Sequence, residues 1–163
     1  MALIDGMLQE LEQEAQTTRR VLERVPDNKL SWRPHEKART LGELALHIAM
    51  VPGAVAELVA TQSTVQAPKF TESSPKSASE LIPALDESIA KAKKVLGGMD
   101  DTALMATWRM MQGERELFAL PRIALLRSVM LNHWQKVLRP SCSCIATTLR
   151  EKTRSSFQLG NRQ

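Results

Sequence analysis

Histidine is the residue type in this sequence with the clearest chemical potential, because an imidazole can bind a transition metal or move a proton near neutral pH. The chain has three histidines: His35, His47 and His133. His35 follows Pro34 in a stretch rich in turn-forming residues, so we expect it in a solvated loop. His47 and His133 each lie within an apolar pattern that is typical of a helix. Two imidazoles on different helices could meet in the core of a helical bundle, where metal sites are often built.

Both of these histidines also have a simpler interpretation. A lone histidine beside an apolar helix face is more often a core residue whose ring is satisfied by a neighbour's hydrogen bond. A divalent ion needs three or four protein donors, or water in the remaining positions. Glu43 is the carboxylate nearest to His47, but a capping role suits it better. Cys142 and Cys144 lie too close for an ordinary disulfide, and without a second pair we interpret them as free thiols.

Helices must position these side chains, and the first two are clear in the sequence. In the first, apolar residues recur at steps of three and four and stop before Pro26. The next stretch is a loop, whose Trp32 is expected to pack onto the bundle. The second helix starts after Thr40, an N-cap that forms a capping box with Glu43. It contains Pro52, which should bend or break it.

The second half of the chain predicts two more helices. Ser77 or Ser79 caps the third, and Gly97 with Gly98 ends it. Its buried side is expected to hold Leu81, Leu85, Ile89, Ala92 and Leu96. Residues 107–120 are either a loop or a short hairpin around Gln112-Gly113. Pro121 then starts a fourth helix. The apolar face of this helix is expected to hold Ile123, Leu126, Val129, Met130 and Trp134.

The composition fits one globular domain. The chain has 163 residues, of which 43% are hydrophobic and 25% charged, and its formal net charge is +4. Much of the basic excess follows residue 133, so no basic face for nucleic acid is expected. We find neither a signal peptide nor an apolar run as long as a membrane span, which predicts a cytoplasmic protein without a membrane partner. We place the domain at residues 1–150 and a polar tail at 151–163.

Two segments resemble the signatures of the DinB family. In LSWRPHEKARTLGELALHIA, a Trp-Arg-Pro turn leads into a helix with a Gly-Glu-Leu-x-x-His pattern; LPRIALLRSVMLNHW combines a Pro-Arg helix start with Asn-His-Trp. The resemblance covers about residues 1–135. It implies an all-α, up-and-down four-helix bundle with a longer connection before the last helix. It also implies a divalent metal, zinc or nickel, held by one histidine of the second helix and two of the last.

His47 matches the first of these metal ligands and His133 the second. The third ligand would follow His133 by one helical turn, and Val137 stands there. The resemblance therefore implies an incomplete site. Arg122 and Arg127, which match the second signature, are interpreted as surface or ion-paired residues.

The sequence from residue 135 onward, QKVLRPSCSCIATTLREKTRSSFQLGNRQ, does not continue the family pattern. Pro140 should break the last helix. Such an abrupt loss of similarity favours the hypothesis of a reading-frame change near residue 135.

Two functions follow from these observations. The resemblance implies a metal-dependent enzyme, a transferase or hydrolase, and in particular a thiol S-transferase in which the metal holds a small thiol as its thiolate. The alternative is a non-catalytic, stress-related bundle that self-associates as a homodimer through an apolar helix face.

Overall fold

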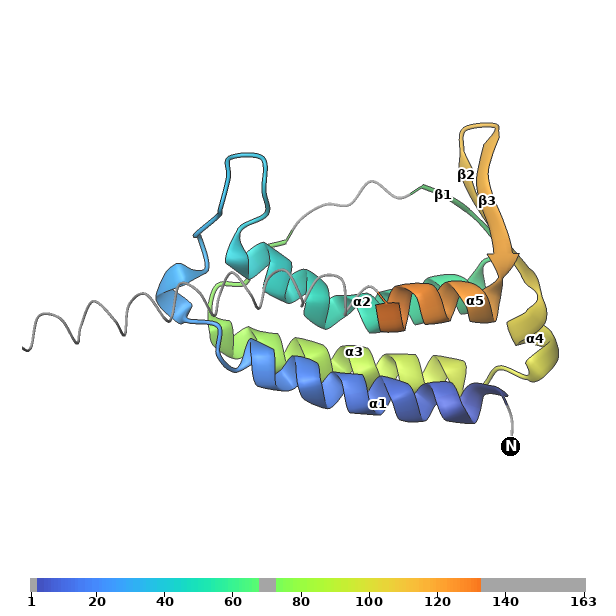
Figure 1. Cartoon of the computed structure of the whole chain (residues 1–163), viewed down its shortest axis with the longest axis horizontal. Coiled ribbons are helices and arrows are strands. Elements are labelled where there is room, and N and C mark those ends of the chain that lie inside the picture. The colour runs from blue at the N-terminus through green and yellow to red at the C-terminus, as the bar shows by residue number, and fades with distance from the viewer. Residues whose placement is uncertain (1–2, 68–72, 133–163) are drawn as a thin grey trace, which may run out of the picture.

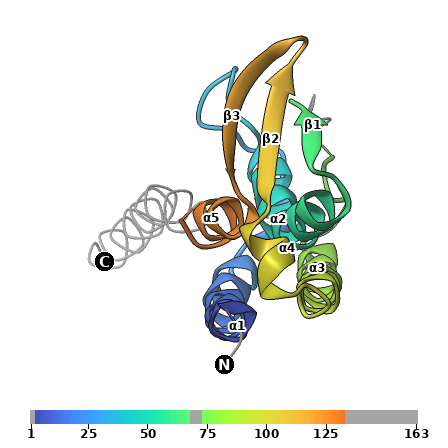
Figure 2. The same ribbon diagram turned by 90° about the vertical axis from the view of Figure 1, so that its right-hand side faces the viewer.

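A computed structural model describes residues 3–67 and 73–132, and three long helices dominate it. They are α1 (Leu3–Leu22), α2 (Leu41–Thr61) and α3 (Leu81–Leu96). The fourth helical position is taken by α5 (Arg122–Leu126), which continues directly as the π-helical segment η3 (Arg127–Asn132). Seen end on, α1, α3, α2 and α5 lie side by side around a common core (Figure 2). The predicted helical bundle is therefore present.

Short elements complete the described part of the chain. Single 3-10 turns, η1 (Asp27–Lys29) and η2 (Ala78–Glu80), precede α2 and α3. Helix α4 (Asp101–Met105) is capped by Asp100, whose side chain accepts a hydrogen bond from Ala103 N. The strands are β1 (Thr64–Gln66), β2 (Thr107–Gln112) and β3 (Arg115–Pro121). The β2–β3 hairpin projects from one end of the bundle (Figure 1).

The all-α prediction is wrong in this respect, because the strands form a three-stranded sheet in the order β1-β2-β3. Strands β2 and β3 are antiparallel around Gly113, whose φ of 61° at the first position of a two-residue turn suits a type II′ hairpin. β1 adds in parallel to β2. A three-residue strand is too short for a periodic signal, and its pairing with a distant segment is a tertiary event.

Buried apolar residues form two clusters. The large cluster draws on every long helix, the hairpin and α5. It contains Ile4, Met7, Leu11, Ala56, Val59, Val65, Ala92, Leu96, Leu104, Trp108, Leu125 and Leu126. The small cluster lies toward the other end of α1, α2 and α3. It contains Leu22, Ala45, Ala49, Leu81 and Leu85. Two buried polar residues, Thr18 of α1 and Ser88 of α3, fall between the clusters along their helices.

Helix α2 corrects the statement that no apolar run is as long as a membrane span. An 18-residue window of this 21-residue helix has a mean hydropathy of 1.7, so by length and composition α2 could cross a membrane. In the bundle, α2 packs along α3 and 44% of this apolar window is buried. The packing accounts for its composition as that of a core helix.

On α3 the predicted buried side is confirmed, with Ile89 partly buried against both clusters, but this side also includes the buried Ser88, which was not predicted. One prediction about a loop needs correction. In the loop before α2, Trp32 is 44% exposed, and Leu30 packs onto the bundle in its place at 8% exposure. The predicted face of the fourth helix is confirmed for Leu126, with Ile123 and Val129 packed against the large cluster. The side chains of Met130 and Trp134, and the domain boundary at residue 150, lie outside the described residues.

Candidate functional site around His47

The start of α2 fixes the backbone on which His47 sits. Thr40 Oγ1 accepts a hydrogen bond from Glu43 N at 3.1 Å, and Thr40 N donates to Glu43 Oε2 at 2.7 Å. Both bonds of the predicted capping box are therefore present. The bond from the Thr40 amide lowers the pKa of Glu43, and the positive charges of Arg33 and Arg39 add to this effect. Glu43 is thus held at the helix start by hydrogen bonds to Thr40.

His47 is half-buried, about two turns along α2 from its capped end. It follows Ala45 of the small cluster and precedes the buried residues Ile48 and Ala49. The imidazole therefore emerges at the edge of the packed face of α2. This position suits a core-edge residue and also a ligand directed toward a neighbouring helix.

His133 comes immediately after Asn132, the last residue that the structure describes. Its approach to His47, the position of Val137 and the two cysteines thus lie outside the described residues. The segment that leads to His133 is η3, a π-helical turn that contacts α1 and α2. Such turns are frequent at functional sites, because an extra residue in the turn changes the direction of the side chains that follow.

The described residues alone do not supply a metal shell. Within 3–67 and 73–132, no three histidine, cysteine, aspartate or glutamate side chains come together. Of the predicted ligands only His47 lies in this part, so the described residues do not form a complete metal site around it. His35 is an exposed loop residue, as predicted, and its Nδ1 accepts a hydrogen bond from Lys37 N at 3.2 Å.

The arginines of the second predicted signature have different roles. Arg127 is largely exposed and pairs with Glu10 of α1 at 3.3 Å, which confirms its interpretation as an ion-paired surface residue. Arg122 is half-buried and donates from Nη1 to the carbonyl oxygen of Ala103 at 3.3 Å. Arg122 thereby ties the start of α5 to α4.

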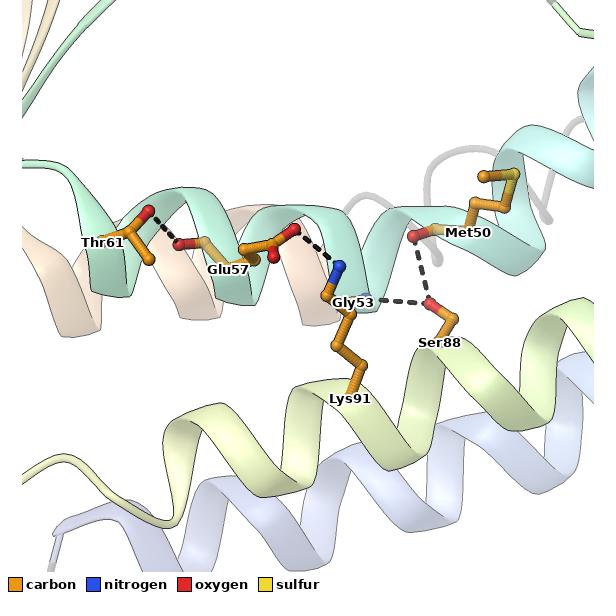
Figure 3. Close-up of polar contacts among 6 residues, drawn as sticks. All are labelled: Met50, Gly53, Glu57, Thr61, Ser88 and Lys91. Carbon is orange, nitrogen blue, oxygen red and sulfur yellow. Dashed lines mark hydrogen bonds and ion pairs between the residues drawn. The ribbon is translucent and has the colours of Figure 1, made fainter.

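Sequence reasoning missed the polar contact between α2 and α3. Figure 3 shows the Ser88 hydroxyl between the backbones of Met50 and Gly53, on either side of Pro52. One signal could have found it: a serine in an otherwise apolar stripe of α3, together with a proline inside the facing helix. Thr18, which interrupts the stripe of α1 in the same way, is fully buried, and its hydroxyl has no hydrogen-bond partner among the residues that the structure describes.

Comparisons with known proteins agree with this architecture. The family model described as the DinB superfamily matches residues 10–126. A DinB-like protein from Bacillus cereus ATCC 10987, known from a crystal structure, is similar in fold with a TM-score of 0.65 and 18% sequence identity. The similarity covers 91% of this chain and 92% of that one. No curated protein matches the chain.

The class of protein is thus a mostly helical bundle with a small sheet at one end. Because the family model spans well over half of the chain, the chain belongs to the DinB superfamily. This confirms the family resemblance found in the sequence.

Proposed function

We propose that this protein is a DinB-type bundle that binds a divalent transition metal, zinc or nickel, through His47 and His133 at an incomplete site. The observation that carries the proposal is the half-buried position of His47 on a firmly capped helix, within the segment matched by the family model. The π-helical turn directly before His133 supports it further.

The donor set limits what such a site can do. A bound metal of this kind would hold a small thiol and lower its pKa, as a thiol S-transferase or a related transferase or hydrolase requires. Two imidazoles fall short of the three or four protein donors of a typical site, and no group of three donor side chains occurs within the described residues. We therefore propose weak metal binding by the chain itself.

Calorimetric titration of the full chain with zinc and with nickel tests the proposal. We expect one weak site, lost in both His47→Ala and His133→Ala. His35→Ala is the matched control, because His35 lies in an exposed loop, and it should bind as the wild type does. Val137→His should tighten binding by restoring the missing donor. A wild type with no saturable binding, or loss of binding in none of the variants, would reject the metal site.

A second candidate is a non-catalytic, stress-related bundle that self-associates as a homodimer. It is favoured by large apolar side chains that remain exposed on neighbouring elements at the sheet end: Met105 (56%), Leu117 (41%) and Leu120 (37%). Light scattering of the wild type and of Leu117→Lys tests it, since a charge on β3 should shift a dimer toward monomer. A monomeric wild type would reject this candidate. For both candidates we expect a cytoplasmic protein without membrane or nucleic-acid partners.

A further inference from the structure

Pro52 creates a local problem within α2. A proline inside a helix has no N–H to donate to the carbonyl four residues earlier, and its ring crowds that carbonyl. Pro52 is nevertheless fully buried and α2 continues past it to Thr61. Gly53, which follows Pro52, is also buried, and a buried N–H without a hydrogen bond is costly.

Ser88 of α3 supplies hydrogen bonds at this point. Its Oγ accepts from Gly53 N at 2.8 Å and donates to Met50 O at 3.0 Å. One hydroxyl therefore joins the backbone of α2 before Pro52 to the backbone after it (Figure 3). Ser88 is only 6% exposed, so water cannot readily replace it.

Gly53 is what lets α3 come close enough to make this bridge. A Cβ at position 53 would lie 2.8 Å from Ser88 O and 3.0 Å from Ser88 Cα. Such contacts involve backbone atoms that cannot move aside without separating the helices. Proline, glycine and serine thus form one unit across the two helices.

This unit divides α2 into two halves with different neighbours. The half before Pro52 carries His47 and packs in the small cluster through Ala45 and Ala49. The half after it packs in the large cluster through Ala56 and Val59, together with Leu125 and Leu126 of α5. The angle of α2 at Pro52 consequently sets the position of His47 relative to the start of the fourth helix.

We infer that Ser88 is a positioning residue, which holds the two halves of α2 at a fixed angle and thereby places His47 relative to the helix that leads to His133. The consequence for a metal site rests on the proposed function. The positioning role of Ser88 does not rest on the proposed function, because amide exchange of Gly53 and the ring signals of His47 are both measured without metal.

The experiment is a double-mutant cycle of Ser88→Ala and Pro52→Ala on the full chain, followed by NMR. In Ser88→Ala, the Gly53 amide should exchange with solvent at least ~10-fold faster relative to that of Ala15 in α1, because a buried donor loses its acceptor. The ring-proton signals of His47 should move, whereas those of His35 should not. In the Pro52→Ala background residue 52 can donate to Ile48 O, and the Gly53 amide can take up its regular helical hydrogen bond to Ala49 O, so the same change should accelerate Gly53 exchange less than ~3-fold.

Lys91→Ala is the matched control. Lys91 lies one turn beyond Ser88 and pairs with Glu57 of α2 at 2.6 Å, but both side chains are well exposed (44% and 51%). Its loss should leave Gly53 exchange and the His47 ring signals unchanged. Equal acceleration of Gly53 exchange by Ser88→Ala with and without Pro52, or unmoved His47 signals, would overturn the inference.

Zinc titration of the same variants keeps this inference separate from the proposed function. If the wild type binds zinc, Ser88→Ala should weaken binding ~10-fold, as is typical when a residue that orients a ligand is removed. Unweakened binding would count against the positioning role. A wild type that binds no zinc rejects the proposed metal site, while the two NMR readouts still decide the role of Ser88.

Discussion

The two apolar clusters differ in how many parts of the chain they join. The large cluster combines α1, α2 and α3 with α4, α5 and residues of β1 and β2. The members of the small cluster come from α1, α2 and α3 alone within the described residues. The sheet end of the bundle is therefore closed by many elements, whereas His47 sits at the end with fewer partners. Within the described residues, more elements therefore stabilise the sheet end of the bundle than the end that carries His47.

The largest expected effect is at the centre of the large cluster. Trp108 is 1% exposed and its ring packs against Phe118 with 6.1 Å between centroids. Trp108→Ala should lower the free energy of unfolding by ~3–5 kcal/mol, because it leaves a large cavity. Urea denaturation measures this. Trp32→Ala is the matched control and should cost little, since Trp32 is 44% exposed; equal costs would contradict the contrast between these sites.

The same substitution in each cluster sharpens the comparison. Leu96 of the large cluster and Leu85 of the small cluster lie on one helix and are 0% and 1% exposed. Truncation to alanine should cost ~2–5 kcal/mol at either site. We expect Leu96→Ala to cost more, because Leu85 also borders a groove between α1 and α3 into which the site can relax. A larger loss for Leu85→Ala in urea denaturation would show that the small cluster is the more important one.

Two glycines test the local geometry of the sheet end. Apart from the local backbone, no described residue comes within 4 Å of a Cβ added at Gly113 or at Gly6, but Gly113 has a φ of 61°. Gly113→Ala should destabilise by ~1–2 kcal/mol, since an L-residue is strained in this region. Gly6→Ala, inside α1, should instead stabilise by ~0.5–1 kcal/mol because alanine favours a helix. Thermal unfolding measures both, and a neutral Gly113→Ala would contradict the proposed turn.

The smallest expected effect is a pH-dependent contribution to the free energy of unfolding, at the end of the bundle that carries His47. The pKa of Glu43 lies below its ordinary value of 4.5 because the Thr40 amide donates to its carboxylate. The charged carboxylate of Glu43 therefore stabilises the folded state in full above the ordinary pKa of 4.5. This contribution to the free energy of unfolding is lost as pH falls through the lowered pKa. Glu43→Gln keeps a capping-box side chain without the charge. Its stability difference from wild type should shrink on acidification.

Thr40→Ala provides the control for this pH dependence. It removes an uncharged cap worth ~1 kcal/mol, so most of its cost should persist at low pH, and only the smaller part that comes from the effect of the Thr40 hydroxyl on the pKa of Glu43 should be lost. A Glu43→Gln difference that is constant with pH would contradict the role of the carboxylate charge.

The long helices and their caps were predictable because their signals are local. The stripe of α1 and the Thr40–Glu43 box each depend on residues within a few positions of one another. The identity of His47 as a candidate ligand also came from the sequence, through the family pattern around it. Its geometry with His133 stays a prediction, because His133 lies outside the described residues.

Other features depended on contacts between distant segments. Ser88 could not be placed opposite Gly53 from sequence, because the contact spans 35 residues and requires the packing of α2 on α3. The pairing of β1 with β2 likewise joins Val65 to Met110. The sequence by itself determined where the three long helices lie and most of the residues that they bury, since both follow from short-range periodicity. Only the tertiary structure decided how Ser88 hydrogen-bonds the backbone on both sides of Pro52, because a hydrogen bond between helices depends on their approach in space.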